Sequence, residues 1–120
     1  MEPSGTNRNL IVCMKQVPDL GIGRTEKTEQ PPHRLPVRLN LLDAYALEAA
    51  ARLRDADKNI HITALSLGRS GEDVALRQAL AIAADDAVLA VVPDPDVLDA
   101  LAVSRLLAWA IRRLEREAGP

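Results

Sequence analysis

Continuous apolar runs alternate along the chain with stretches in which apolar residues recur every three or four positions. The runs are short and predict three strands, at residues 9–17, 60–67 and 86–92. In the first of them Leu10 to Met14 is apolar without interruption, which is typical of a strand covered on both faces. A strand followed by a helix, three times over, predicts an α/β fold with a parallel sheet, right-handed connections and flanking helices.

The longer stretches predict three helices, at about residues 41–55, after Ser70, and at about residues 96–117. Asn40 and Asp43 have the spacing of a capping box at the start of the first helix, and Ser70 and Asp73 repeat it before the second. Each helix carries an apolar stripe that we expect to face the core. The stripes are Leu42, Ala46, Ala49 and Leu53; Leu76, Ala79, Leu80 and Ala83; and Ala100, Val103, Leu107, Ala110 and Leu114.

The remaining segments set the expected boundaries of the domain. Residues 1–8 are polar and predict a flexible tail, and residues 9–120 predict a single α/β domain. The proline-rich residues 18–39 predict a long loop with room for a short hairpin. Because a three-stranded parallel sheet has edges with unpaired backbone groups, we expect either the first half of a larger domain or a chain that takes strands from a partner.

The composition narrows the classes of partner. Hydrophobic residues make up 48 % of the chain but aromatic residues only 2 %, which argues against a stacking platform for nucleic acid. The net charge of −2 gives no reason to expect a polyanion either. The longest apolar run, residues 87–92, is too short to span a bilayer, and the polar first residues predict no signal peptide. The single cysteine, Cys13, fits a reducing, cytoplasmic compartment.

Few side chains are spaced for catalysis or for binding a metal. His33 and His61 have no acidic or serine partner at a useful spacing, and one cysteine with two distant histidines makes no metal-ligand pattern. Cys13 has no nearby base in the sequence, so we expect it to be a small buried hydrophobe rather than a nucleophile. The pattern therefore favours a protein that is not an enzyme.

The last predicted helix carries one unusual group of side chains. Trp109 falls near Arg105 and Arg112, away from the stripe expected to face the core. Such a group is compatible with a surface for a partner and equally with the edge of the core.

Three segments of the chain resemble the electron transfer flavoprotein beta subunit family. They are IVCMKQVPDL, LNLLDAYALEAAARLRD and ITALSLGRSGEDVALRQALAIAADDAVLAVV, and their order and most of their spacing agree from about residue 9 to residue 113. The resemblance implies a Rossmann-like fold of the adenine-nucleotide alpha-hydrolase type, here with three βα units. It also implies a heterodimer with a larger alpha subunit that holds most of the FAD, a structural AMP on the beta subunit, and transfer of electrons from dehydrogenases to an acceptor.

Carried over by position, the resemblance implies contacts with AMP at six residues: Cys13, Asn40, Leu41, Leu42, Asp43 and Leu67. All lie where a strand ends or where the next helix begins, and open α/β sheets bind nucleotides at this edge. The phosphate loop of the family follows a fourth strand, which these 120 residues do not include, so we expect an incomplete AMP site.

Two other functions and one mode of association are also compatible with the sequence. The chain could be a stand-alone adenine-nucleotide-binding module of the universal stress protein type, or a truncated remnant without a ligand. If the strand order follows the resembled fold, residues 9–17 form an edge strand that is apolar on both faces. Such an edge predicts self-association, or a partner that adds a strand.

Overall fold

The computed structural model describes residues 8–18 and 37–118. Almost all of the predicted tail and most of the proline-rich loop, with His33, lie outside these residues. The elements are, in order, β1 (Arg8–Met14), β2 (Gln16–Pro18), β3 (Val37–Leu39), α1 (Leu41–Ala56), β4 (Ile60–Gly68), α2 (Val74–Ile82), β5 (Asp86–Val91), the 3-10 turn η2 (Pro95–Val97) and α3 (Ala100–Ala118). The three predicted strands and the three predicted helices are all found, with shifts at their ends.

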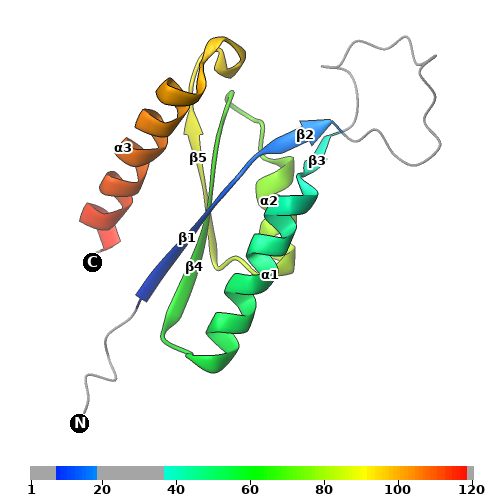
Figure 1. Cartoon of the computed structure of the whole chain (residues 1–120), viewed down its shortest axis with the longest axis vertical. Coiled ribbons are helices and arrows are strands. Elements are labelled where there is room, and N and C mark those ends of the chain that lie inside the picture. The colour runs from blue at the N-terminus through cyan, green and yellow to red at the C-terminus, as the bar shows by residue number, and fades with distance from the viewer. Residues whose placement is uncertain (1–7, 19–36, 119–120) are drawn as a thin grey trace, which may run out of the picture.

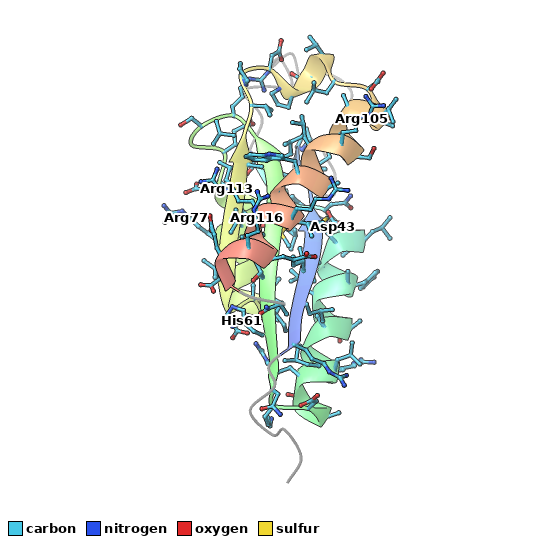
Figure 2. The ribbon with its side chains drawn as sticks, turned by 90° about the vertical axis from the view of Figure 1, so that its left-hand side faces the viewer. Asp43, His61, Arg77, Arg105, Arg113 and Arg116 are labelled. Atoms are coloured by element: carbon cyan, nitrogen blue, oxygen red, sulfur yellow. The ribbon has the colours of Figure 1, made fainter. Side chains whose placement is uncertain are left out.

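One parallel sheet organises the domain, with its strands in the order β1–β4–β5 (Figure 1). Val12 of β1 lies opposite Ala64 of β4, and Leu65 of β4 lies opposite Val88 of β5. Helices α1 and α2 cover one face of the sheet, and α3 lies on the other (Figure 1), in front of the sheet in Figure 2. This arrangement confirms the predicted α/β fold. It also places β1 at an edge of the described sheet, as the resembled strand order predicts.

The predicted first strand is in fact two strands that part at Lys15. The backbone N–H of Lys15 donates to the Asp43 carboxylate at 2.7 Å, and its carbonyl accepts from the backbone N–H of Asn40 at 3.2 Å. Because these bonds hold the Lys15 backbone at the start of α1, the ladder to β4 ends at Met14. The chain then continues as β2, which pairs antiparallel with β3.

The face of α1 that meets the core is not the predicted one. Leu47 and Ala50 are buried against the sheet, whereas Leu42 and Leu53 are 71 % and 53 % exposed, and Ala46 and Ala49 are exposed as well. Apolar residues occur on two sides of this helix, so its periodicity does not identify the inner side. The cap at Asn40 and the bond from Lys15 to Asp43 hold the start of the helix, and they leave the Leu42 stripe facing outward.

In α2 the predicted stripe is largely confirmed, because Leu76, Ala79 and Ala83 are buried while Leu80 is exposed. The predicted Ser70–Asp73 capping box is wrong. The helix begins only at Val74, and Glu72 accepts the backbone N–H of Arg69 at 2.5 Å. The side chain of Asp73, the cap residue itself, makes no capping bond.

Helix α3 begins four residues later than predicted. Asp94 and Pro95 start a separate turn, in which the Asp94 side chain accepts the backbone N–H of Asp96. Asp99 then accepts the N–H of Ala102 at 2.8 Å, at the true start of the helix. Of the predicted stripe, Ala110 is buried, Val103, Leu107 and Leu114 are half-buried, and Ala100 is exposed. No helix in the described part of the chain has both the length and the apolar content required to cross a membrane.

Candidate functional site

A cavity of about 290 Å³ opens at the carboxyl-terminal end of the parallel strands, between the sheet and α3. Its volume is at the small end of the range for ligand pockets, which run from roughly 300 to 1,000 Å³. The residues that line it come from the ends of β1 and β4, the start of α1, the turn η2 and the first half of α3. They are Cys13, Met14, Lys15, Asn40, Asp43, Leu67, Pro95, Val103 and Leu107.

The polar wall of the cavity is built where β1 ends and α1 begins. Asp43 accepts the backbone N–H of Lys15, and the Asn40 side chain accepts the N–H of Leu42 at 3.2 Å as the cap of α1. Both side chains are therefore held in place by backbone groups before any ligand arrives. A rigid wall of this kind can present oxygen acceptors to a ligand at little cost in conformational entropy.

The sulfur at this wall is not set up as a nucleophile. Cys13 is exposed, which corrects the expectation that it would be a buried hydrophobe. Partial burial by its neighbours raises the pKa of the thiol, and repulsion from the Asp43 carboxylate raises that pKa further. A thiol with a raised pKa is mostly protonated at neutral pH, so it is a poor nucleophile. It can still serve as a small contact surface for a ligand.

The opposite wall is apolar. Leu67 at the end of β4 meets Val103 and Leu107 of α3 there, and Pro95 of η2 adds the rim. Because α3 covers the face of the sheet away from α1, its placement decides how deep the cavity is. A cavity with apolar side chains on one side and fixed oxygen acceptors on the other suits a flat, largely apolar ring that carries hydrogen-bond donors.

A charged clamp holds the Pro95 rim. One terminal nitrogen of Arg69, Nη2, is 2.9 Å from both the Asp94 and the Asp96 carboxylates, on either side of Pro95. These bonds join the turn after β4 to the turn after β5, and the backbone N–H of Val92 donates to the Gly68 carbonyl beside them. The hydrogen bond to Asp96 is the main cause of the raised pKa of Arg69, so the guanidinium of this clamp stays charged.

The opposite end of the sheet is closed by its own side chains. The Asp85 carboxylate accepts the backbone N–H of Ile62 at 2.8 Å and pairs with Arg54 at 2.9 Å. The bond from Ile62 is the main cause of the lowered pKa of Asp85, with Arg54 adding to it. His61 lies beside this group and contacts Asp86 at 2.7 Å. No metal-binding cluster of at least three His, Cys, Asp or Glu side chains occurs among residues 8–18 and 37–118.

Four of the six predicted site residues meet at the cavity, namely Cys13, Asn40, Asp43 and Leu67. The other two do not line it, since Leu41 and Leu42 are 51 % and 71 % exposed on the outside of α1. Five residues that line the cavity were not among the predicted site residues: Met14, Lys15, Pro95, Val103 and Leu107. Only the Asp94–Pro95–Asp96 triplet, which follows shortly after the end of β5 at Val91, could have drawn attention to the rim.

Comparison with known proteins gives a consistent family. Residues 32–118 match the model of the electron transfer flavoprotein domain. The chain is 39 % identical over 112 residues to the electron transfer flavoprotein subunit beta of Megasphaera elsdenii, covering 92 % of this chain and 42 % of that protein. It is 40 % identical over 112 residues to protein FixA of Bradyrhizobium diazoefficiens, covering 92 % and 38 %.

A further relative is named for a different role. The chain is 31 % identical over 107 residues to the acryloyl-CoA reductase electron transfer subunit gamma of Anaerotignum propionicum, covering 88 % of this chain and 40 % of that protein. In each of these comparisons the chain spans about two fifths of the length of its relative.

Proposed function

The chain belongs to the electron transfer flavoprotein domain family, as a protein of the beta-subunit type, and on this basis we propose that it supports electron transfer through a flavin held mainly by a partner subunit. In this role it carries electrons within a complex and catalyses no bond-making step of its own. The partner is an alpha-type subunit, and dehydrogenases supply the electrons. The observation that carries the proposal is the cavity at the carboxyl-terminal edge of the sheet, in a chain of this family.

We assign the cavity to the adenine half of AMP. Its volume of about 290 Å³ suits a ring system rather than a dinucleotide. Leu67, Val103 and Leu107 would contact the faces or edges of the ring, while oxygens of Asp43 and Asn40 would accept from the exocyclic amino group. Lys15, the cation among the lining residues, would meet the phosphate at the mouth. Four of the positions implied by the family resemblance support this assignment by lying together there.

AMP should bind weakly to these 120 residues. Apart from Lys15, the lining residues supply no cationic side chain for the phosphate. We expect a dissociation constant weaker than about 10 μM, which corresponds to roughly −7 kcal/mol. We also expect the purified chain to be colourless, with FAD retained only after an electron transfer flavoprotein alpha subunit is added.

The test is a titration with AMP followed by NMR, with one substitution in the cavity and one beside it. Val103→Phe fills the apolar wall, and we expect it to weaken AMP binding about tenfold or more. Ser104→Phe, at the next residue of α3, points to solvent and should change the affinity less than twofold. If both variants bind AMP like the wild type, the cavity is not the site. A dissociation constant for AMP in the nanomolar range, measured on the wild-type chain, would instead favour a stand-alone nucleotide-binding module.

The same proposal includes association through the β1 side of the domain. No described strand pairs with the outer edge of β1. On the outer side of α1, Leu42, Tyr45 and Leu53 are exposed, and a shallow recess lies between Tyr45 and Arg52. An unpaired edge strand and an exposed apolar helix face are features that another polypeptide can cover. We therefore propose that the chain self-associates, or pairs with a partner subunit, on this side.

Analytical ultracentrifugation of two matched double variants tests the association. The first double variant, Leu42→Glu with Leu53→Glu, places charges on the outer face of α1. It should weaken self-association, with the dissociation constant of the dimer raised at least about tenfold. The control double variant, Leu80→Glu with Ile82→Glu, places the same charges on exposed apolar positions of α2. It should leave the dissociation constant of the dimer within about twofold of the wild-type value. A wild-type chain that stays monomeric at millimolar concentration would contradict self-association, and equal shifts in both variants would contradict the assigned face.

A further inference from the structure

The outward side of α3 carries a row of arginines around the single tryptophan of the chain. Arg105, Trp109, Arg112 and Arg116 follow one another at helical spacing, and Arg113 flanks them; we call these five residues the α3 basic face. All five are exposed, with Trp109 53 % exposed. The half-buried residues Val103, Leu107 and Leu114 lie on the other side of the helix, toward the sheet. Figure 2 shows α3 in front of the sheet, with its labelled arginines spread along the helix.

Three arginines of this face, Arg105, Arg112 and Arg116, differ from most arginines elsewhere in the domain. Arg52, Arg54, Arg69 and Arg77 each lie within 4.0 Å of a carboxylate, in pairs such as Arg54–Asp85 at 2.9 Å. Among residues 8–18 and 37–118, no carboxylate lies within that distance of the arginines at positions 105, 112 and 116. Positive charge thus accumulates on one face of a chain whose net charge is −2.

The side chain of Trp109 is both held in place and exposed, so it is available to contact a partner. The guanidinium of Arg113 lies over the Trp109 ring, 5.7 Å from its centre, and is itself held by Glu117 at 3.1 Å. This cation–π contact restricts the indole while leaving more than half of its surface open. Tryptophan and arginine are the residue types that contribute most often to binding energy at protein interfaces. An exposed tryptophan with arginines on both sides of it along the helix therefore matches a partner surface that has an apolar recess bordered by carboxylates.

We propose that the α3 basic face docks an acidic surface on a protein partner. Trp109 would enter a small apolar recess of that partner, and the guanidinium groups of Arg105, Arg112 and Arg116 would pair with carboxylates around it. The proposal does not depend on the AMP cavity, because the two α3 residues that line the cavity, Val103 and Leu107, lie on the opposite side of the helix.

Two other classes of partner fit this face less well. A helix that lies on a membrane inserts its apolar side, and here that side is already packed on the sheet. Single-stranded nucleic acid calls for several stacking aromatics along a basic groove, whereas this face has one aromatic residue with Glu115 and Glu117 nearby. Both classes become outcomes of the experiment below.

The single tryptophan allows direct detection of binding at this face. The probe is a fluorescently labelled synthetic peptide of about 20 residues that forms an amphipathic helix of leucine and glutamate. We expect saturable binding by anisotropy and a blue shift of Trp109 emission on addition of the unlabelled peptide. The triple variant Arg105→Gln, Arg112→Gln, Arg116→Gln should lose about tenfold or more in affinity. The control triple variant Arg8→Gln, Arg52→Gln, Arg77→Gln removes the same charge elsewhere and should lose less than threefold.

Several results would overturn the proposal. They are equal losses in the two triple variants, an unchanged Trp109 spectrum at saturation, and no binding of the peptide up to millimolar concentration. Tighter binding of single-stranded DNA or of phosphatidylglycerol vesicles than of the peptide, lost in the α3 variant, would assign the face to that other class. Circular dichroism melts of both variants establish that the losses do not come from unfolding.

Discussion

At the amino-terminal end of the sheet the Asp85 carboxylate is bonded on two sides, whereas at the carboxyl-terminal end the polar side chains border a cavity. Asp85 accepts hydrogen bonds from the Ile62 backbone and from Arg54, so its carboxylate stabilises the fold. Asp43 also accepts a backbone N–H, yet it still faces the cavity between Lys15 and Leu67. The comparison indicates that polar groups at one end close the domain, and that those at the other end leave room for a ligand.

Substitution at the closed end should have the largest effect on stability. Asp85→Ala removes the acceptor for the Ile62 N–H and the partner of Arg54, so we expect a loss of about 2 kcal/mol in the free energy of unfolding. Asp86→Ala is the matched control, because among the described residues the Asp86 side chain makes a hydrogen bond or ion pair only with the half-exposed His61, and it should cost less than about 0.5 kcal/mol. Urea denaturation at neutral pH measures both. Equal losses would mean that the closed end is not organised around Asp85.

The same carboxylate sets a dependence on pH. The pKa of Asp85 is lower in the folded protein than its ordinary value of about 3.9, so its stabilising contribution is complete above that value. The contribution is lost as the pH falls through the lowered pKa. We therefore expect the stability gap between the wild type and Asp85→Asn to be constant from pH 7 to about pH 5 and to close below about pH 4. A gap that already closes near pH 6 would contradict the assignment of this pH dependence to Asp85.

At the carboxyl-terminal end of the sheet, the helix cap at Asn40 should contribute less to stability than Asp85 does. Asn40→Ala removes the acceptor for the N–H of Leu42 and should cost about 1 kcal/mol. Leu41→Pro, at the first residue of α1, should cost little, because proline suits that position and the backbone N–H there has no helical partner. Thermal melts of the two variants check the order. Unfolding of Leu41→Pro would show that α1 starts elsewhere.

The smallest effect is expected from the clamp at the rim. Arg69→Met removes the bonds to Asp94 and Asp96, which frees the Pro95 turn and should weaken AMP binding about threefold. Amide exchange at residues 94–98 should become faster. Arg77→Met breaks a surface pair with Asp73 and should change neither quantity. Faster exchange without weaker binding would restrict Arg69 to a role in the fold.

Much of the fold could be predicted because it depends on local patterns. The order of strands and helices, the parallel sheet and the cap at Asn40 follow from periodicity and from side-chain chemistry within a few residues. The inner stripe of α2 was predicted in large part, because Leu76, Ala79 and Ala83 are buried as expected, although Leu80 of the same stripe is exposed. Such signals act between residues close together in the chain, and they fail where another contact takes their place, as at the predicted Ser70–Asp73 capping box.

The candidate site was predictable only in part. Family resemblance indicated Cys13, Asn40, Asp43 and Leu67, which lie at strand ends and at a helix start, where parallel topology brings them together. It did not indicate Val103, because the depth of the cavity depends on how α3 lies across the sheet. No local sequence pattern determines how far α3 lies from the sheet.

Tertiary structure alone decided which side of α1 faces the core. The helix carries apolar residues on two sides, Leu47 with Ala50 and Leu42 with Leu53, and either side could have been buried on hydrophobicity alone. The choice is tied to the contact between Asp43 and the backbone of Lys15, residues that are 28 positions apart in the chain. That contact ends the first strand and holds the first turn of the helix beside it. A periodicity reports that a helix is amphipathic, but its rotation against the sheet follows from bonds between distant segments.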